Sequence, residues 1–92
     1  MTLAAKRHLA RVAGLGCVVC KRLYGEPAAA QVHHIREGRI ARNDWLTIPL
    51  CEPHHLGTTM SVHKAKPQLL RALKIGSEFD LLADVIEALT KG

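Results

Sequence analysis

Apolar residues recur with the period of an α-helix at the start of the chain. The stripe that they form consists of Leu3, Leu9, Val12 and Ala13. Thr2 precedes the stripe and is a residue type that caps helices, whereas Gly14 follows it and is a residue type that ends them. The pattern predicts a helix over about residues 3–13, with basic residues on its other face.

Two further helices are predicted near the other end of the chain. The first begins close to Pro67, a residue that the first turn of a helix tolerates, and ends at Gly76. The second has Ser77 as its N-cap, with Asp80 three residues later, and runs to about Thr90. Its apolar positions, which we predict to be core, are Leu81, Leu82, Val85, Ile86 and Leu89.

Short extended segments lie between these helices. Residues 29–35 and 45–50 have the composition of strands, and Pro49 restricts the second strand to the edge of a sheet. The polar, arginine-containing residues 35–44 between them are expected to form an exposed loop.

The remaining segments are predicted to be loops and one short helix. Residues 14–20 contain two glycines and are expected to form a loop that turns sharply around a metal ion. A short helix is expected from Pro53 until Gly57 interrupts it. The whole pattern predicts a small α+β protein.

Length and composition limit what such a protein can do. Its 92 residues are enough for one small domain, in which a basic helix (1–16) precedes a core segment (17–66) and further helices (67–92). Only three residues are aromatic: Tyr24, Trp45 and Phe79. This low count argues against a stacking platform of the kind that reads single-stranded bases.

The basic charge is concentrated in the first two segments. Residues 1–16 hold three basic and no acidic residues, residues 17–66 seven basic and four acidic, and residues 67–92 three basic and four acidic. The formal net charge of +5 suits a polyanionic partner such as DNA. The alternative is a solubilising surface, since an excess of this size is common in small soluble proteins.

The cysteines have the spacing of a zinc site. Cys17 and Cys20 are separated by two residues, and so are Cys51 and His54, which lets a tight turn present both side chains to one tetrahedral ion. We predict a Cys₃His structural zinc site, with His55 as the alternative fourth ligand. The other interpretation is three buried thiols without a metal.

The cysteine count also bears on the compartment. Three cysteines cannot all pair within one chain, and neither a signal peptide nor a long apolar span is recognisable. We therefore expect a cytoplasmic protein without membrane association, in which thiolates bind metal.

Four histidines remain after the zinc site is assigned. They are His33, His34, His55 and His63. Neutral imidazole is a good ligand for transition ions, and an imidazole that is not bound to metal is a suitable base for water near neutral pH. The cluster is therefore typical of a catalytic metal site, whereas the isolated His8 is interpreted as an ordinary polar residue.

Residues between positions 17 and 64 carry a resemblance to a known family. They are Cys17-Val18-Val19-Cys20, His33-His34-Ile35-Arg36, the segment from Asp44 to Cys51, His54-His55, Gly57 and His63. They resemble the HNH endonucleases and, more narrowly, phage-encoded recombination nucleases of the Ref-like type. The resemblance implies a zinc-stabilised ββα-metal core with flanking helices at both termini.

The resemblance also implies a role for each histidine. It makes His33 and His55 ligands of a catalytic ion, either Mg²⁺ or another divalent metal of the transition series. His34 becomes the general base, and His63 a further residue that touches the metal or the scissile phosphate. Adjacent residues of a regular strand face opposite sides, so His33 and His34 can address one site only where the strand ends.

One residue of the HNH pattern is missing. The asparagine that gives the motif its middle letter would fall at Leu46. Asn43 or Asp44 can substitute through hydrogen bonds between side chain and backbone, and the Ref-like group favours aspartate at this point. We therefore include Asp44 with His34 among the predicted catalytic residues.

The expected function is metal-dependent cleavage of DNA phosphodiester bonds in phage recombination or DNA processing. The residues expected to hold backbone phosphates are Arg36, Arg39 and Arg42. One alternative is a zinc-stabilised module that binds nucleic acid without catalysis, and another is an adaptor whose basic surface meets an acidic protein. Because a chain this small does not enclose a duplex alone, homodimerisation or recruitment by a recombinase filament is expected.

Overall fold

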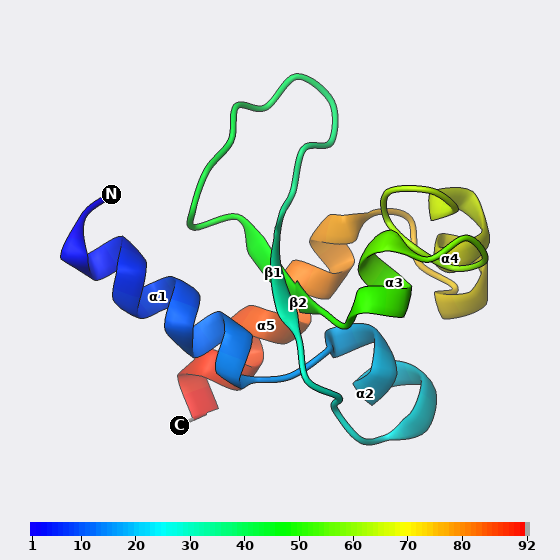
Figure 1. Ribbon diagram of the computed structural model, residues 1–92, viewed down its shortest axis with the longest axis horizontal. Coiled ribbons are helices and arrows are strands. Elements are labelled where there is room, and N and C mark those ends of the chain that lie inside the picture. Colours follow the sequence, from blue (N-terminus) through cyan, green and yellow to red (C-terminus); the bar gives the residue numbers. More distant parts are fainter. Residues whose placement is uncertain (92) are drawn as a thin grey trace.

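The computed structural model describes residues 1–91 and shows a small sheet surrounded by helices (Figure 1). In chain order the elements are α1 (Leu3–Gly14), α2 (Val18–Tyr24), β1 (Gln31–His34), β2 (Thr47–Leu50), α3 (Glu52–Leu56), α4 (Lys66–Leu73) and α5 (Glu78–Lys91). The predicted α+β class is therefore confirmed. Gly92, the last residue of the predicted C-terminal segment, lies outside the described residues.

The sheet is an antiparallel pair that brings the two strand segments together. Gln31 lies opposite Leu50, and His34 lies opposite Thr47. Within the described residues each strand has one neighbour, so both are edge strands. Pro49 on β2 has no amide proton to donate, and an edge strand tolerates this. The intervening residues 35–46 form a long loop that projects beyond the helices (Figure 1). This arrangement places the adjacent histidines at the end of β1.

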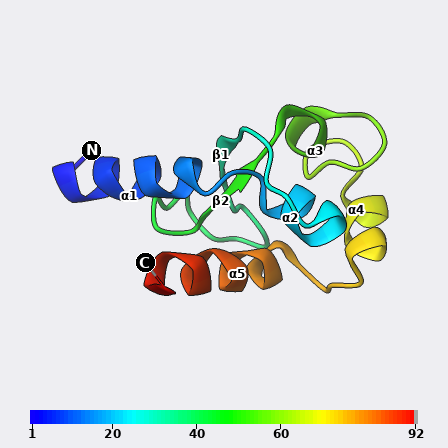
Figure 2. The same ribbon diagram turned by 90° about the horizontal axis from the view of Figure 1, so that it is seen from below.

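A buried apolar core holds the helices against the sheet. In Figure 2, α1 and α5 run alongside each other, and the Arg11 guanidinium donates to the Leu89 carbonyl at 3.1 Å. The large side chains that are fully buried include Val12, Val19, Ile35, Ile48, Leu50, Leu69, Leu81 and Val85. Each contributes on the order of 1.5–3 kcal/mol relative to exposure. The core therefore draws on both ends of the chain.

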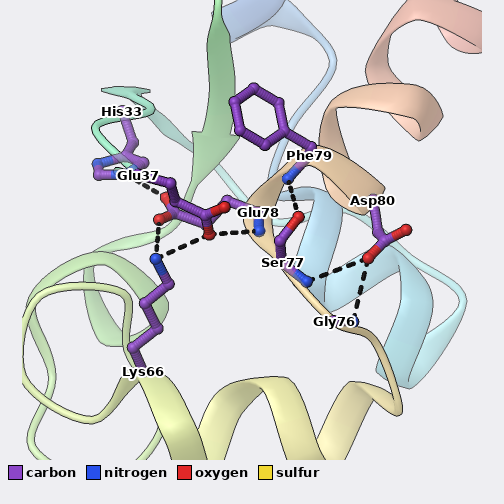
Figure 3. A network of polar contacts seen from close by, with 8 residues as sticks. All are labelled: His33, Glu37, Lys66, Gly76, Ser77, Glu78, Phe79 and Asp80. Atoms are coloured by element: carbon purple, nitrogen blue, oxygen red, sulfur yellow. Dashed lines mark hydrogen bonds and ion pairs between the residues drawn. The ribbon is translucent and has the colours of Figure 1, made fainter. Parts of the chain in front are cut away.

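The predicted N-caps of the first and last helices are confirmed. The Thr2 Oγ1 accepts a hydrogen bond from the Ala5 amide at 3.0 Å. At α5, the Ser77 Oγ accepts from the Phe79 amide and the Asp80 carboxylate accepts from the Ser77 amide, both at 3.1 Å (Figure 3). Each bond satisfies a backbone donor that the helix itself leaves free.

The prediction of a loop over residues 14–20 was wrong in its second half. Helix α2 begins immediately after Cys17, and Gly25 ends it in the left-handed conformation with φ of 82°. The reason is that the Cys17 sulfur caps the helix by accepting from the Cys20 amide at 3.4 Å. Sequence rules assign this task to oxygen-bearing side chains, so the helix start was not recognised.

Two further expectations need correction. Ile86 was predicted to be core but is 52% exposed, because only the Leu81, Leu82 and Val85 side of α5 faces the interior. Helix α4 ends before the predicted stop at Gly76, since Lys74 already adopts the left-handed conformation with φ of 57°.

Within residues 1–91, no helix has the length and apolar character needed to cross a membrane.

Candidate metal centres and catalytic histidines

Three thiols and one imidazole meet in the interior, at the start of α2 and the start of α3. The four residues are Cys17, Cys20, Cys51 and His54, and their ligand atoms all lie within 4.8 Å of one another. All four are buried. Cys17 and Cys51 are the N-cap residues of α2 and α3, so two helix starts converge on the cluster.

The spacing of the ligand atoms fits a tetrahedral zinc ion. The His54 Nδ1 lies 3.7, 3.5 and 3.2 Å from the sulfurs of Cys17, Cys20 and Cys51. Two of those sulfurs, on Cys20 and Cys51, are 3.6 Å apart. Tetrahedral geometry with ordinary zinc bond lengths gives about 3.6 Å between sulfur and nitrogen and about 3.8 Å between sulfurs. The cluster can therefore hold a metal such as zinc, with His54 as its fourth member.

The protonation of the cluster depends on what occupies it. Burial raises the pKa of the Cys20 thiol to about 12, and hydrogen bonds with Cys51 and Cys17 add to this effect. The pKa of Cys51 is also raised, chiefly by burial, whereas burial lowers the pKa of His54. A divalent cation stabilises thiolates that burial alone disfavours. The donor set is thus suited to a cation.

Three other imidazoles form a second cluster on the surface side of α3. The ligand atoms of His33, His55 and His63 lie within 4.8 Å of one another, and the ring centroids are 4.8 to 5.2 Å apart. The Nε2 atoms of His55 and His63 are 3.1 Å apart. Two nitrogens bound to one ion at ordinary lengths are separated by about 2.9–3.4 Å. This cluster also has the spacing of a metal site, and it includes an exposed histidine.

Hydrogen bonds set the ring orientation in this cluster. The Gln31 side-chain oxygen lies 2.9 Å from the His55 Nδ1. Because an amide oxygen accepts, the ring proton belongs on Nδ1, and the His55 Nε2 offers a lone pair to an ion. Burial, together with the nearby His33 and His63, lowers the pKa of His55. The neutral form that binds metals is therefore favoured.

Hydrogen bonds at the end of α3 turn the chain back on itself, so that His63 lies close to His55. At Gly57, which ends α3, a Cβ would collide with the Pro53 carbonyl oxygen. The Val62 amide then donates to the His54 carbonyl at 3.0 Å, and the buried Ser61 hydroxyl donates to the Gly57 carbonyl. The loop that carries His63 is therefore tied to α3 immediately beside the histidine.

His34 lies outside both clusters and pairs with Asp44. Its Nε2 is 2.8 Å from the Asp44 Oδ1, and the side chain is half-buried. Asn43 performs a different task, since its Oδ1 accepts from the Trp45 amide at 2.9 Å. Of the two predicted substitutes for the missing asparagine, Asn43 therefore holds the loop and Asp44 holds the histidine.

Comparison with known protein families gives a match that covers almost the whole chain. The family model for recombination enhancement, RecA-dependent nuclease, matches residues 1–90. The chain belongs to this family. Searches of curated proteins and of solved structures found no match.

Membership of the RecA-dependent nuclease family reaches beyond the sequence resemblance. The resemblance rested on residues between 17 and 64, whereas the family match also includes α1 and all but the end of α5. The chain is therefore a relative of nucleases over its flanking helices as well.

The arginines predicted to hold DNA all lie on the loop between β1 and β2. Arg36, Arg39 and Arg42 are exposed. Among the described residues, the ion pairs of the structure involve none of these three guanidinium groups. They are therefore available to an anion such as the phosphate backbone of a nucleic acid.

Two residues beside the histidines were not predicted from the sequence. Gln31 contacts His55, and Glu78 contacts His33 at 2.5 Å although 45 positions separate them in the chain. Gln31 lies on the exposed side of a strand, where a polar residue is unremarkable by sequence rules. Glu78 occupies the first turn of a helix, where an acidic residue has an ordinary explanation in the helix dipole.

Proposed function

We propose that this protein is a metal-dependent DNA endonuclease of the HNH type that acts in RecA-dependent recombination. The observation that supports this best is the adjacency, at the end of β1, of His33 in a three-imidazole cluster and His34 in a pair with Asp44. Hydrolysis of a phosphodiester uses a metal ion and a base that act on the same phosphate and water, and neighbouring positions at a strand end can supply one residue for each task. Membership of the RecA-dependent nuclease family agrees with this chemistry.

The order of the elements supports a ββα-metal core. Two antiparallel strands are followed directly by α3, so His33 on β1 and His55 on α3 come from the first strand and the helix of one unit. The zinc site fixes the base of the same helix through His54. We assign both sites to residues 17–66 of a single domain that spans residues 1–92, with helices of 1–16 and 67–92 as supports.

The His34–Asp44 pair supplies the proton chemistry in this mechanism. A carboxylate accepts hydrogen bonds, so the ring proton of His34 belongs on the Nε2 that faces Asp44, and Nδ1 carries the lone pair. His34 takes a proton from water at Nδ1, and the water oxygen attacks phosphorus. The bond from phosphorus to the leaving oxygen then breaks. Asp44 holds the ring in place and stabilises the imidazolium that forms.

The second cluster determines which ion suits the reaction. An ion held by His33, His55 and His63 would neutralise negative charge that develops on the phosphate and the leaving oxygen. Three imidazoles favour a transition-metal ion over Mg²⁺, which prefers oxygen ligands. The donor set is therefore chemically matched to Mn²⁺, Ni²⁺ or Zn²⁺, and water or substrate oxygens would complete the coordination.

A cleavage assay tests the proposed function. Zinc-loaded protein is incubated with plasmid and with RecA-coated DNA, in the presence of Mg²⁺, Mn²⁺ or Ni²⁺, with and without chelator. We expect cleavage that depends on added metal and on the RecA-coated substrate. If no combination of metal and substrate is cut while DNA is still bound, the nuclease proposal fails and a zinc-stabilised binding module replaces it.

Substitutions in the loop separate the two tasks that replace the missing asparagine. Asp44→Ala should reduce cleavage by an amount approaching that of removing His34, because the base loses its orientation and its counter-charge. Asn43→Ala removes a hydrogen bond of similar length from the same loop and serves as the matched control. Its expected loss of cleavage rate is much smaller. Wild-type cleavage by Asp44→Ala, measured as initial rates, would exclude Asp44 from the site.

The arginines of the β1–β2 loop should control the affinity for DNA. Replacing Arg36, Arg39 and Arg42 together by Ala should weaken binding similarly for all sequences, because phosphate contacts carry no base information. The slope of log affinity against log salt should fall by about 0.9 for each lost phosphate contact. Binding measured over a range of salt concentrations checks this. An unchanged slope would place the DNA surface elsewhere, most simply on the exposed Lys6 and Arg7 of α1.

A further inference from the structure

A buried acidic residue on α5 directly contacts the histidine that the proposed mechanism makes a metal ligand. The Glu78 Oε1 lies 2.5 Å from the His33 Nε2, and both side chains are less than 10% exposed. Burial of a carboxylate is costly unless the charge is paired and hydrogen-bonded. The position of Glu78 against His33 therefore needs a physical reason.

Part of that reason is a network of charged groups (Figure 3). The Lys66 ammonium, from the start of α4, lies 2.6 Å from Glu78 and 2.8 Å from Glu37. The Glu37 carboxylate also accepts from the Glu78 amide at 2.8 Å. Burial alone would raise the pKa of Glu78, but hydrogen bonds from His33 and Lys66 outweigh burial and lower its pKa. Glu78 is thus a carboxylate that Lys66 stabilises in place.

The geometry of the bond fixes which ring nitrogen of His33 faces an ion. Because a carboxylate accepts, the proton of His33 lies on Nε2 and Nδ1 keeps its lone pair. A carboxylate behind the ring also makes the imidazole a stronger ligand. Glu78 itself is not among the three residues whose ligand atoms cluster, so in this geometry it supports the site and does not enter it.

We propose that Glu78 is a positioning residue for the histidine metal site, which it completes by holding His33 as the Nδ1 ligand. The proposal rests on the proposed function only in taking His33, His55 and His63 as a metal site. It assigns a role to α5, a helix that lies outside the ββα unit. In a purely structural role, Glu78 would only pair with Lys66 and so connect α5 to α4 and to Glu37.

The first test uses the wild-type protein. In long-range proton–nitrogen NMR spectra of zinc-loaded protein, His33 should carry its proton on Nε2, and a second equivalent of Zn²⁺ should shift Nδ1. A proton on Nδ1, coordination through Nε2, or no binding of the second Zn²⁺ would overturn the proposal. The spectra require no cleavage, so they decide the role of Glu78 separately: a protein that cuts no DNA would contradict the nuclease function alone.

The second test measures affinity for the second Zn²⁺ by competition titration. Glu78→Ala should weaken binding by about 10- to 100-fold, the usual effect of removing such a partner, and should mix the two ring forms of His33. Glu78→Gln keeps an accepting oxygen but loses the charge, so its affinity for the second Zn²⁺ should lie between that of the wild-type protein and that of Glu78→Ala. Glu37→Gln is the matched control, because it disturbs Lys66 and the α5 start without touching His33. Equal losses in Glu37→Gln and Glu78→Ala would show a structural role only.

Discussion

His34→Ala should abolish most DNA cleavage while leaving the fold and both proposed metal sites intact. A general base contributes on the order of 100- to 10,000-fold to rate, equivalent to about 2.7–5.5 kcal/mol of activation free energy. The side chain is half-buried at the end of β1 and bonds to Asp44, and it is not a member of either cluster of ligand atoms. Initial rates of cleavage at saturating metal measure the effect.

Two controls make that result specific. His8→Ala removes a histidine on α1 that packs against Trp45 and belongs to neither cluster of ligand atoms, so this variant should cut at the wild-type rate. His33→Ala should behave differently from His34→Ala, since higher metal concentrations should partly restore activity to a variant that lacks a ligand. Cleavage by His34→Ala at more than a tenth of the wild-type rate would remove His34 from the mechanism.

Cys51→Ser should lose bound zinc and most of the folded structure. Metal binding and folding are one free energy in small zinc domains, with apparent values of about 10–16 kcal/mol, whereas whole domains are stable by about 5–15 kcal/mol. Cys51 is buried, occupies the N-cap position of α3 and lies 3.2 Å from the His54 Nδ1. Circular dichroism and zinc content of the purified variant measure the loss.

The matched control for this prediction is a ligand of the other cluster. His63→Ala removes an exposed imidazole and should keep one zinc per chain and a wild-type unfolding temperature. If Cys51→Ser kept its zinc and its thermal stability, the interior cluster would be only a set of buried thiols. Equal destabilisation by both variants would mean that the two clusters are not separate sites.

Much of the fold follows from local patterns in the sequence. The caps at Thr2 and Ser77, the two strands and the short helix that Gly57 ends were all predicted, because each depends on residues a few positions apart. Helix α2 was missed because its cap is a sulfur. Ile86 was misplaced because periodicity gives the apolar side of a helix but does not say how much of that side another element covers.

The candidate sites divide in the same way. The spacing of Cys17, Cys20, Cys51 and His54 was sufficient to group them, but it could not decide between His54 and His55, and only the winding of α3 separates those two. Glu78 could not be assigned to His33 from the sequence, since the contact exists only when α5 packs beside the strand. Long-range contacts of this kind leave no local pattern.

The rate of cleavage of RecA-coated DNA, measured against the concentration of added Mn²⁺, tests the central claim most directly. The protein should carry one tightly bound zinc at the start, with the histidine cluster stripped by mild chelation. We predict no cleavage before addition, a saturable rise with Mn²⁺, and a midpoint shifted to higher concentration in His55→Ala, all at constant helical content. Cleavage that is equally fast in excess chelator, or absent at every Mn²⁺ concentration, would contradict a metal-dependent nuclease built on the histidine cluster.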